Sequence, residues 1–206
     1  MARLVEIHPV DPQPRAVGQV VEQLTAGALV AYPTDSGYAL GCRVGQHDGT
    51  ERIRQIRRLD ARHHFTLMCA SFAHLGQLVR LDNSAFRAIK AATPGPYTFI
   101  LPATAEVPRR LAHPKKKTVG VRIPDSRVVQ ALLRELGEPL LSSTLILPDR
   151  SEPMTQGWEV ADTLEHVVDV VVESGDVVAE PTTVVDFSAG YPQVVRVGAG
   201  DPAPFS

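Results

Sequence analysis

The chain contains few cysteines and few aromatic side chains. Two of its 206 residues are cysteines, Cys42 and Cys69, and aromatic residues make up 5% of it. Two cysteines cannot build a disulfide framework, and their spacing does not match the C-x-x-C of redox and zinc sites. We therefore expect Cys42 and Cys69 to be buried free thiols of a reducing compartment.

Long apolar runs are absent too. No run approaches the ~20 residues that cross a bilayer, and the first residues lack the apolar core of a signal peptide. Glycine and proline, at 15 and 17 residues, barely exceed ordinary usage, and the 44% hydrophobic content suffices for a core. The composition therefore predicts a folded cytoplasmic protein with no membrane partner.

The standard nucleotide-binding and hydrolase motifs are also missing. The sequence has no G-x-x-x-x-G-K-[ST], no G-x-G-x-x-G after a strand, no G-x-S-x-G and no H-E-x-x-H. Its seven histidines form no cluster with cysteines or carboxylates at metal-ligand spacing, so we expect no protein-bound metal. Any nucleotide must therefore be held without a P-loop or a Rossmann turn.

Charge is distributed unevenly along the chain. The net charge is -2, yet residues 1–122 carry 17 Lys and Arg against 9 Asp and Glu, whereas residues 123–206 carry 4 against 14. Because local fields steer ligands more than net charge does, the basic part predicts a phosphate-bearing partner. The alternative, which this count leaves open, is that the charges are solvated or face each other across the fold.

The hydrophobic periodicity is typical of a mixed α/β domain. No linker divides the chain, so we expect one domain over residues 1–206, with the acidic part 150–206 completing its sheet. Strands are predicted at 4–7, 28–32, 65–69, 97–101, 118–123, 140–147, 167–172, 182–187 and 193–197. Helices are predicted at 14–26, from a capping box at 48–51, from 82 or 83 to 92, at 126–137 and near 158–164. Because strands outnumber β-α-β units, the sheet should be mixed.

Four polar segments could carry chemistry. Residues 32–41 follow a buried strand, where open α/β sheets place ligands, and they include Thr34 and Ser36. Residues 52–64 and 109–118 are basic; guanidinium groups suit phosphate oxygens, although an exposed basic face is the commoner explanation. Residues 141–146 place three hydroxyls in an apolar strand, where they bond either backbone or a ligand.

Five motifs, in the same order, resemble those of the YrdC-like family, and the match is closest to its YciO branch. Residues 32–41 (YPTDSGYALG) resemble the family's Y-P-T-E-T-x-Y-G-L-G, and residues 93–98 (TPGPYT) its P-G-P-x-T. Residues 118–124 (TVGVRIP) resemble V-x-V-R-x-P, residues 181–186 (PTTVVD) resemble S-T-[IV]-[IV]-D, and residues 195–199 (VRVGA) resemble L-R-x-G-A. The resemblance covers nearly the whole chain. It implies a twisted mixed sheet flanked by helices, with an electropositive concave face that was first associated with double-stranded RNA.

The resemblance also implies a chemistry. Well-understood members of the family make L-threonylcarbamoyl-AMP from ATP, L-threonine and bicarbonate, releasing pyrophosphate, and partner proteins transfer the threonylcarbamoyl group to an adenosine of tRNA. ATP would then be a substrate that carries Mg²⁺ with it. The roles expected from the resemblance and from the basic loop are substrate binding for Thr34, Thr66 and Arg122, nucleotide binding for Thr118, Lys117, Ser142 and Ser143, catalysis for Arg57, Arg58 and Thr144, and RNA binding for Arg109, Arg110, Lys115 and Lys116.

Two positions depart from the family's pattern. The catalytic K-x-R falls on Arg57-Arg58-Leu59, so Leu59 stands where the family has its arginine. The S-x-N falls on Thr144-Leu145-Ile146, so Ile146 stands where the family has its asparagine. Each donor missing from a site of this kind is worth ~2.7–4 kcal/mol of transition-state stabilisation. Arg58, Arg62 or His63 could replace the lost groups.

These departures leave two hypotheses open. The first is a nucleotidyltransferase that forms, or acts on, L-threonylcarbamoyl-AMP. The second is a module that binds RNA, either tRNA or double-stranded RNA, or a nucleotide, without synthase activity.

Overall fold

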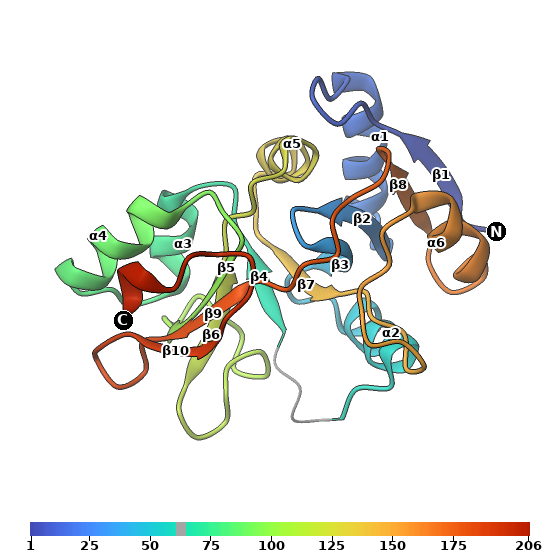
Figure 1. Cartoon of the computed structure of the whole chain (residues 1–206). Helices are drawn as coiled ribbons and strands as arrows, with labels where there is room; N and C mark the ends of the chain where they lie inside the picture. Colours follow the sequence, from blue (N-terminus) through green and yellow to red (C-terminus); the bar gives the residue numbers. More distant parts are fainter. Residues whose placement is uncertain (61–64) are drawn as a thin grey trace.

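The computed structural model describes residues 1–60 and 65–206, and this part of the chain folds into one mixed sheet flanked by helices (Figure 1). Its strands are β1 (Arg3–Glu6), β2 (Val30–Thr34), β3 (Gly37–Arg43), β4 (Thr66–Met68), β5 (Tyr97–Pro102), β6 (Thr118–Arg122), β7 (Leu140–Thr144), β8 (Val170–Glu173), β9 (Thr183–Asp186) and β10 (Gln193–Arg196). Its helices are α1 (Pro14–Thr25), α2 (His47–Arg57), α3 (Phe72–Leu78), α4 (Asn83–Ala92), α5 (Arg127–Leu136), α6 (Gly157–Thr163) and the 3-10 helix η1 (Ala203–Phe205).

The strand order confirms the mixed α/β sheet. It runs β1-β8-β2-β3-β7-β4-β6-β5-β9-β10. The pairs β1/β8, β8/β2, β4/β6 and β5/β9 are parallel, and the other neighbouring pairs are antiparallel. The acidic C-terminal segment supplies β8 near one edge and the hairpin of β9 and β10 at the other. Figure 1 places the two chain termini at opposite sides of the molecule.

Two hydrophobic clusters form because successive side chains of a strand point to opposite faces. In β2, Ala31 belongs to one cluster, whereas Val30 and Tyr32 belong to the other. The second cluster is covered by α1 and α5, which pack against each other, and the first receives buried side chains from α2, α3, α4 and α6. The helices α1 and α5 therefore cover only part of their face of the sheet (Figure 1).

Helix α5 has the limits that the sequence predicts. Ser126 caps its start by accepting a hydrogen bond from the Val129 backbone N–H, and Gly137 ends it in the left-handed conformation at φ 73°. Its apolar side includes Leu132 and Leu133, which are fully buried. Truncating either leucine to alanine should cost about 2–5 kcal/mol of stability.

The expectation that residues 32–41 only follow a buried strand needs correction, because they are largely strand themselves. This segment is an antiparallel hairpin of β2 and β3 that turns at Asp35 and Ser36. The Thr34 hydroxyl closes the turn, because Oγ1 donates to Gly37 O at 2.7 Å and accepts from Ser36 N at 3.0 Å. A local side-chain bond of this kind stabilises a tight turn that strand periodicity alone does not reveal.

Three other element predictions need correction. Helix α2 begins at His47 after Gln46, which makes no side-chain cap, so the capping box at 48–51 is absent. Strand β7 ends at Thr144 rather than at residue 147, because the Ile146 N–H turns back to donate to Thr144 O at 3.1 Å. The sequence prediction also lacks α3, a helix of seven residues that is too short for a clear periodicity.

Both cysteines are buried and free, as expected. Burial raises the pKa of Cys42 to about 11 and that of Cys69 to about 12, so both thiols stay protonated at neutral pH. Over residues 1–60 and 65–206, no helix is long and apolar enough to span a bilayer.

Candidate functional site

A cavity opens beside the shortest strand of the sheet. Strand β4 has three residues, and its first, Thr66, pairs with Ser142 of β7 and with Gly120 of β6. Strand β7 continues to Ser143 and Thr144, which pair with β3 and, among the described residues, have no partner on the β4 side. The cavity at this position has a volume of about 220 Å³. The described residues that line it are Arg57, Thr66, Met68, Thr98, Arg122, Ser142, Ser143, Thr144, Ile146, Thr182, Val184 and Arg196.

The lining is cationic and rich in hydroxyls. It contains Arg57, Arg122 and Arg196, and among the described residues it contains no carboxylate. Asp35 pairs with Arg122 from outside the lining, and the other two arginines leave an excess of positive charge, which attracts anionic ligands in a partly enclosed space. Six residues that the sequence selects meet here, namely Arg57, Thr66, Arg122, Ser142, Ser143 and Thr144.

Arg122 lies on β6 and is held by the hairpin turn. Its Nη2 donates to Oδ1 of Asp35, and the two side chains are 4% and 12% exposed. Burial lowers the pKa of Arg122, and the Asp35 carboxylate opposes this shift. The buried Nε has no hydrogen-bond partner within the described part of the chain. The guanidinium is therefore fixed at one nitrogen and unsatisfied at another.

Arg57, the last residue of α2, spans from the helix to the end of β7. Its Nη1 donates to Ser143 Oγ at 2.5 Å, and its Nε donates to Ile146 O at 3.3 Å. Burial lowers the pKa of Arg57. Because an arginine can only donate, the Ser143 hydroxyl accepts this bond and keeps its own proton for a ligand.

Ser142 is in a different situation from Ser143. Its Oγ lies 2.6 Å from the hydroxyl of the buried Tyr32 and 3.3 Å from Leu40 O. If Ser142 donates to the carbonyl, Tyr32 must donate to Ser142, and both protons are used. A phosphate oxygen only accepts hydrogen bonds, so Ser142 is poorly suited to bind one.

Three polar lining residues were not selected from the sequence, namely Thr98, Thr182 and Arg196. The Thr98 and Thr182 hydroxyls are 2.9 Å apart, and Arg196 donates to Thr182 Oγ1 at 3.1 Å and to Thr182 O at 3.0 Å. All three lie within the motifs 93–98, 181–186 and 195–199, so the signal was present in the sequence. Only the pairing of β5 with β9 shows that two of these motifs are adjacent.

Other predicted residues lie outside the cavity lining. The hydroxyl of Thr34 is engaged in the hairpin turn, and Thr118 is buried at the start of β6. Arg58 is exposed and ends α2 in the left-handed conformation at φ 50°. Of the two departures from the family pattern, Ile146 lines the cavity, whereas Leu59 packs against the hydrophobic core. Arg62 and His63, considered as replacements, lie outside the described residues.

The basic loop forms a separate groove of about 850 Å³ that includes Arg80, Arg109, Lys116 and Lys117. Lys116 Nζ lies 3.7 Å from Asp186 Oδ2. The remaining residues predicted to bind RNA lie near it in sequence: Lys115 is exposed, and Arg110 donates to Gly45 O. The loop therefore presents cations to solvent instead of to the cavity beside β4. No cluster of three or more His, Cys, Asp or Glu suited to a metal is found in residues 1–60 and 65–206.

Comparisons with known proteins find matches to both the sequence and the fold. The model of the Sua5/YciO/YrdC family, described as telomere recombination, matches residues 22–198. The crystal structure of Escherichia coli YciO has a TM-score of 0.96 and 47% identity, and each chain is covered completely. A threonylcarbamoyl-AMP synthase of Vibrio vulnificus strain YJ016 is 33% identical over 157 residues, covering 75% of this chain and 83% of the synthase. P. abyssi Sua5 complexed with L-threonine shares the fold, with a TM-score of 0.85 at 23% identity over 95% of this chain and 57% of Sua5.

Proposed function

Because the chain belongs to the Sua5/YciO/YrdC family, we propose that it binds L-threonine and ATP at the cavity beside β4 and forms, or acts on, L-threonylcarbamoyl-AMP. The product would serve the modification of a tRNA adenosine in the cytoplasm. The names of the synthase from V. vulnificus and of the threonine complex of P. abyssi Sua5 support the substrate class.

The observation that carries this proposal is the state of Arg122. Its guanidinium is almost fully buried, is held by Asp35 and lines the cavity with an unpartnered Nε among the described residues. A buried donor without a partner costs ~1–3 kcal/mol. The carboxylate of threonine would satisfy this donor, since arginine binds carboxylates through charge-assisted hydrogen bonds.

The size of the cavity limits what it encloses. Its volume of about 220 Å³ is smaller than the ~300–1,000 Å³ typical of pockets for drug-sized ligands. A cavity of this size suits an amino acid together with the α-phosphate of ATP, while the adenosine would extend towards solvent. Arg57 would bind phosphate or carbamate oxygens at the β7 side, together with the hydroxyl proton of Ser143, for which no acceptor is found among the described residues.

The reaction balances without a protein-bound cofactor. Bicarbonate and the threonine amine form a carbamate and release water; a carbamate oxygen then attacks the α-phosphorus of ATP, and pyrophosphate leaves. The residues of the cavity would hold the anions together and stabilise the charge that develops. Since no carboxylate lies among the described lining residues, the ATP phosphates would carry the Mg²⁺. Ile146 offers no amide donor, so we expect slow turnover.

Calorimetric titration with L-threonine and with ATP, each alone, tests the proposal. We expect both to bind the natural protein. Arg122→Ala should raise the dissociation constant of threonine at least tenfold, or about 1.4 kcal/mol, and leave that of ATP nearly unchanged. Binding of neither ligand by the natural protein would contradict the proposal, whereas equal loss of both in the variant would indicate a damaged fold.

The basic groove supports a second candidate function, RNA binding without synthesis. Four cations line it, Arg80, Arg109, Lys116 and Lys117, and such a surface suits a phosphate backbone. Affinity for a tRNA or a double-stranded RNA should then fall steeply between low and physiological salt. Affinity that does not change with salt would exclude this function.

A further inference from the structure

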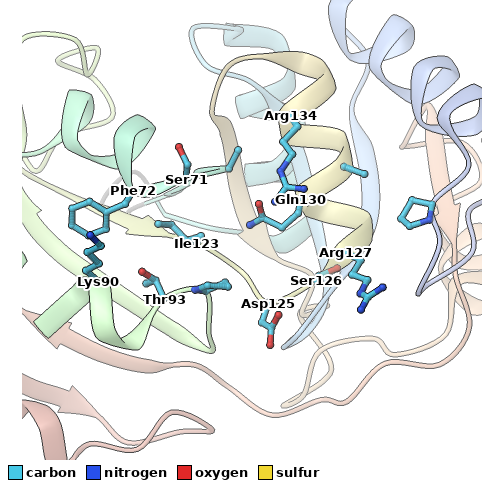
Figure 2. A pocket seen from close by; sticks show the side chains of 14 residues that line it. Ser71, Phe72, Lys90, Thr93, Ile123, Asp125, Ser126, Arg127, Gln130 and Arg134 are labelled. Atoms are coloured by element: carbon cyan, nitrogen blue, oxygen red, sulfur yellow. The ribbon is translucent and has the colours of Figure 1, made fainter. Parts of the chain in front are cut away.

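A second cavity lies where the parallel strands β4 and β6 end, between α5 on one side and α3 and α4 on the other (Figure 2). Its volume is about 690 Å³, and it shares no lining residue with the cavity beside β4. The carboxyl ends of adjacent parallel strands, followed by a helix N-terminus, are a common place for ligands in α/β sheets. Nothing in the proposed function uses this cavity.

Gln130 of α5 is the unusual residue of this second cavity. It is 9% exposed, and its Nε2 donates to Pro124 O at 3.0 Å. Because a carbonyl oxygen can only accept, this bond fixes which end of the amide is the oxygen. Oε1 is buried and has no hydrogen-bond partner in residues 1–60 and 65–206. Figure 2 shows the Gln130 amide pointing from α5 into the cavity, towards Ile123. The cavity therefore has, at Oε1, an unsatisfied acceptor for an N–H or O–H donor.

A cation lies beside this acceptor, and another lies across the cavity. Arg134 lies one turn further along α5, with its side chain beside Gln130 in Figure 2, and Lys90 lies on α4 across the cavity. The hydroxyl of Ser71 accepts from His74 N at 3.3 Å and so keeps its proton to donate. Asp125 is the one carboxylate among the described lining residues, and in Figure 2 it points away from Gln130. The space around Gln130 is therefore suited to an anion.

Apolar groups complete the lining. Phe72, Ile123 and Pro94 present ring and aliphatic surface to the cavity. A volume of about 690 Å³ falls within the ~300–1,000 Å³ that encloses a drug-sized ligand. A ligand that fits must combine an anionic group, a hydrogen-bond donor and a body with apolar faces.

We propose that the second cavity binds a nucleoside monophosphate. The phosphate lies beside Arg134, an N–H or O–H of the base or ribose donates to Gln130 Oε1, and the base packs against the apolar wall. Neither inorganic phosphate nor a free nucleoside satisfies all three features. Both should bind more weakly than the nucleotide.

The test is a titration of the ¹⁵N-labelled full chain with AMP, followed by NMR. We expect saturable shifts of the Gln130 side-chain amide and of the backbone amides of Ser71 and Ser126. Adenosine and inorganic phosphate should each bind at least tenfold more weakly at these resonances. Absence of saturable shifts up to about 10 mM AMP, or equal binding of phosphate alone, overturns the proposal.

Variants separate this site from the cavity beside β4. Gln130→Leu and Arg134→Gln should each weaken AMP binding at these resonances at least tenfold, and Arg87→Gln, an exposed arginine of α4 outside the lining, should not. Resonances of Thr66 and Arg122 report on the other cavity and should respond as in the natural protein. Should Gln130→Leu fail to fold, the exposed Arg134 still provides the test, and unchanged affinity in Arg134→Gln contradicts the proposal.

Discussion

The guanidinium of Arg122 is paired with the carboxylate of Asp35, and both side chains are almost completely withdrawn from solvent. The other carboxylate oxygen of Asp35 accepts from the backbone N–H of Asp125 at 3.0 Å. One carboxylate at the turn of β2 and β3 therefore holds both the side chain of Arg122 and the chain that follows β6. This pair fixes the position of Arg122 in the lining of the cavity without a ligand.

Removing the carboxylate of Asp35 should destabilise the fold. In Asp35→Ala the charge of Arg122 stays buried without its partner, which typically costs about 3–5 kcal/mol. Urea denaturation measures the free energy of unfolding. The double variant Asp35→Ala, Arg122→Met should recover part of the loss, because it removes the isolated charge. A single variant as stable as the natural protein would show that the pair is not structurally important.

Arg57 and Arg58 are both predicted to be catalytic, but they have different surroundings in the structure. Arg57 reaches Ser143 in the cavity, whereas Arg58 is exposed and lies outside the lining. Arg57→Ala should therefore weaken ATP binding at least tenfold. The matched control Arg58→Gly, which suits the positive φ of that position, should leave it unchanged. Calorimetry that finds the opposite order would assign the phosphate site to Arg58.

The two departures from the family pattern should respond differently to reversal. Ile146 lines the cavity, so Ile146→Asn adds an amide donor there and should accelerate adenylate formation by up to ~10²-fold. Leu59 packs against the core, so Leu59→Arg should lower the melting temperature, because it replaces apolar packing with a charge. A folded Ile146→Asn variant with no gain in product would show that the pocket around it has diverged too.

Asp169 makes stability depend on acid pH. Burial opposes its ionisation, but hydrogen bonds from Arg52 and from the Leu29 N–H, both at 2.7 Å, prevail and lower its pKa. A carboxylate with a lowered folded-state pKa stabilises the protein above the unfolded value, near ~3.9, and this contribution is lost as pH falls through the folded value. Urea denaturation at several pH values should show it.

The exposed carboxylate of Asp162 provides the control for this effect of pH on stability. Asp169→Asn should remove part of the decline in unfolding free energy below pH ~4, whereas Asp162→Asn, at an exposed position of α6, should not. The side chain of Asp169 is 41% exposed, so solvent screens the effect and it should be modest. Identical pH profiles for natural protein and Asp169→Asn would contradict the assignment.

Local patterns predicted much of the fold. Helix α5 was predictable because Ser126, a run of apolar residues at helical spacing and Gly137 all act within one segment. The hairpin of β2 and β3 was not, because its turn depends on the Thr34 hydroxyl and its pairing on the burial of both strands. Strand β4 was predicted within one residue at each end, whereas α3, with seven residues, carries too little periodicity to be predicted at all.

The site was predictable in part. The family resemblance identified Thr66 and Arg122, but no pattern in the sequence shows that Asp35 accepts a hydrogen bond from one nitrogen of that arginine. Likewise Ser142 and Ser143 look equivalent in sequence, and only the packing of Tyr32 and Arg57 separates an engaged hydroxyl from a free one. Contacts between residues far apart in the chain decide which polar groups are left for a ligand.

Measuring adenylate formation is the most direct test of whether the protein is a synthase that works through the cavity beside β4. Pure protein at high concentration is incubated with ATP, Mg²⁺, bicarbonate and labelled L-threonine, and labelled adenylate and pyrophosphate are measured. We expect equal amounts of both products from the natural protein and, at subsaturating threonine, at least tenfold less of each from a folded Arg122→Ala variant. Absence of both products from the natural protein, or undiminished synthesis by that variant, would contradict a synthase that works through the cavity beside β4.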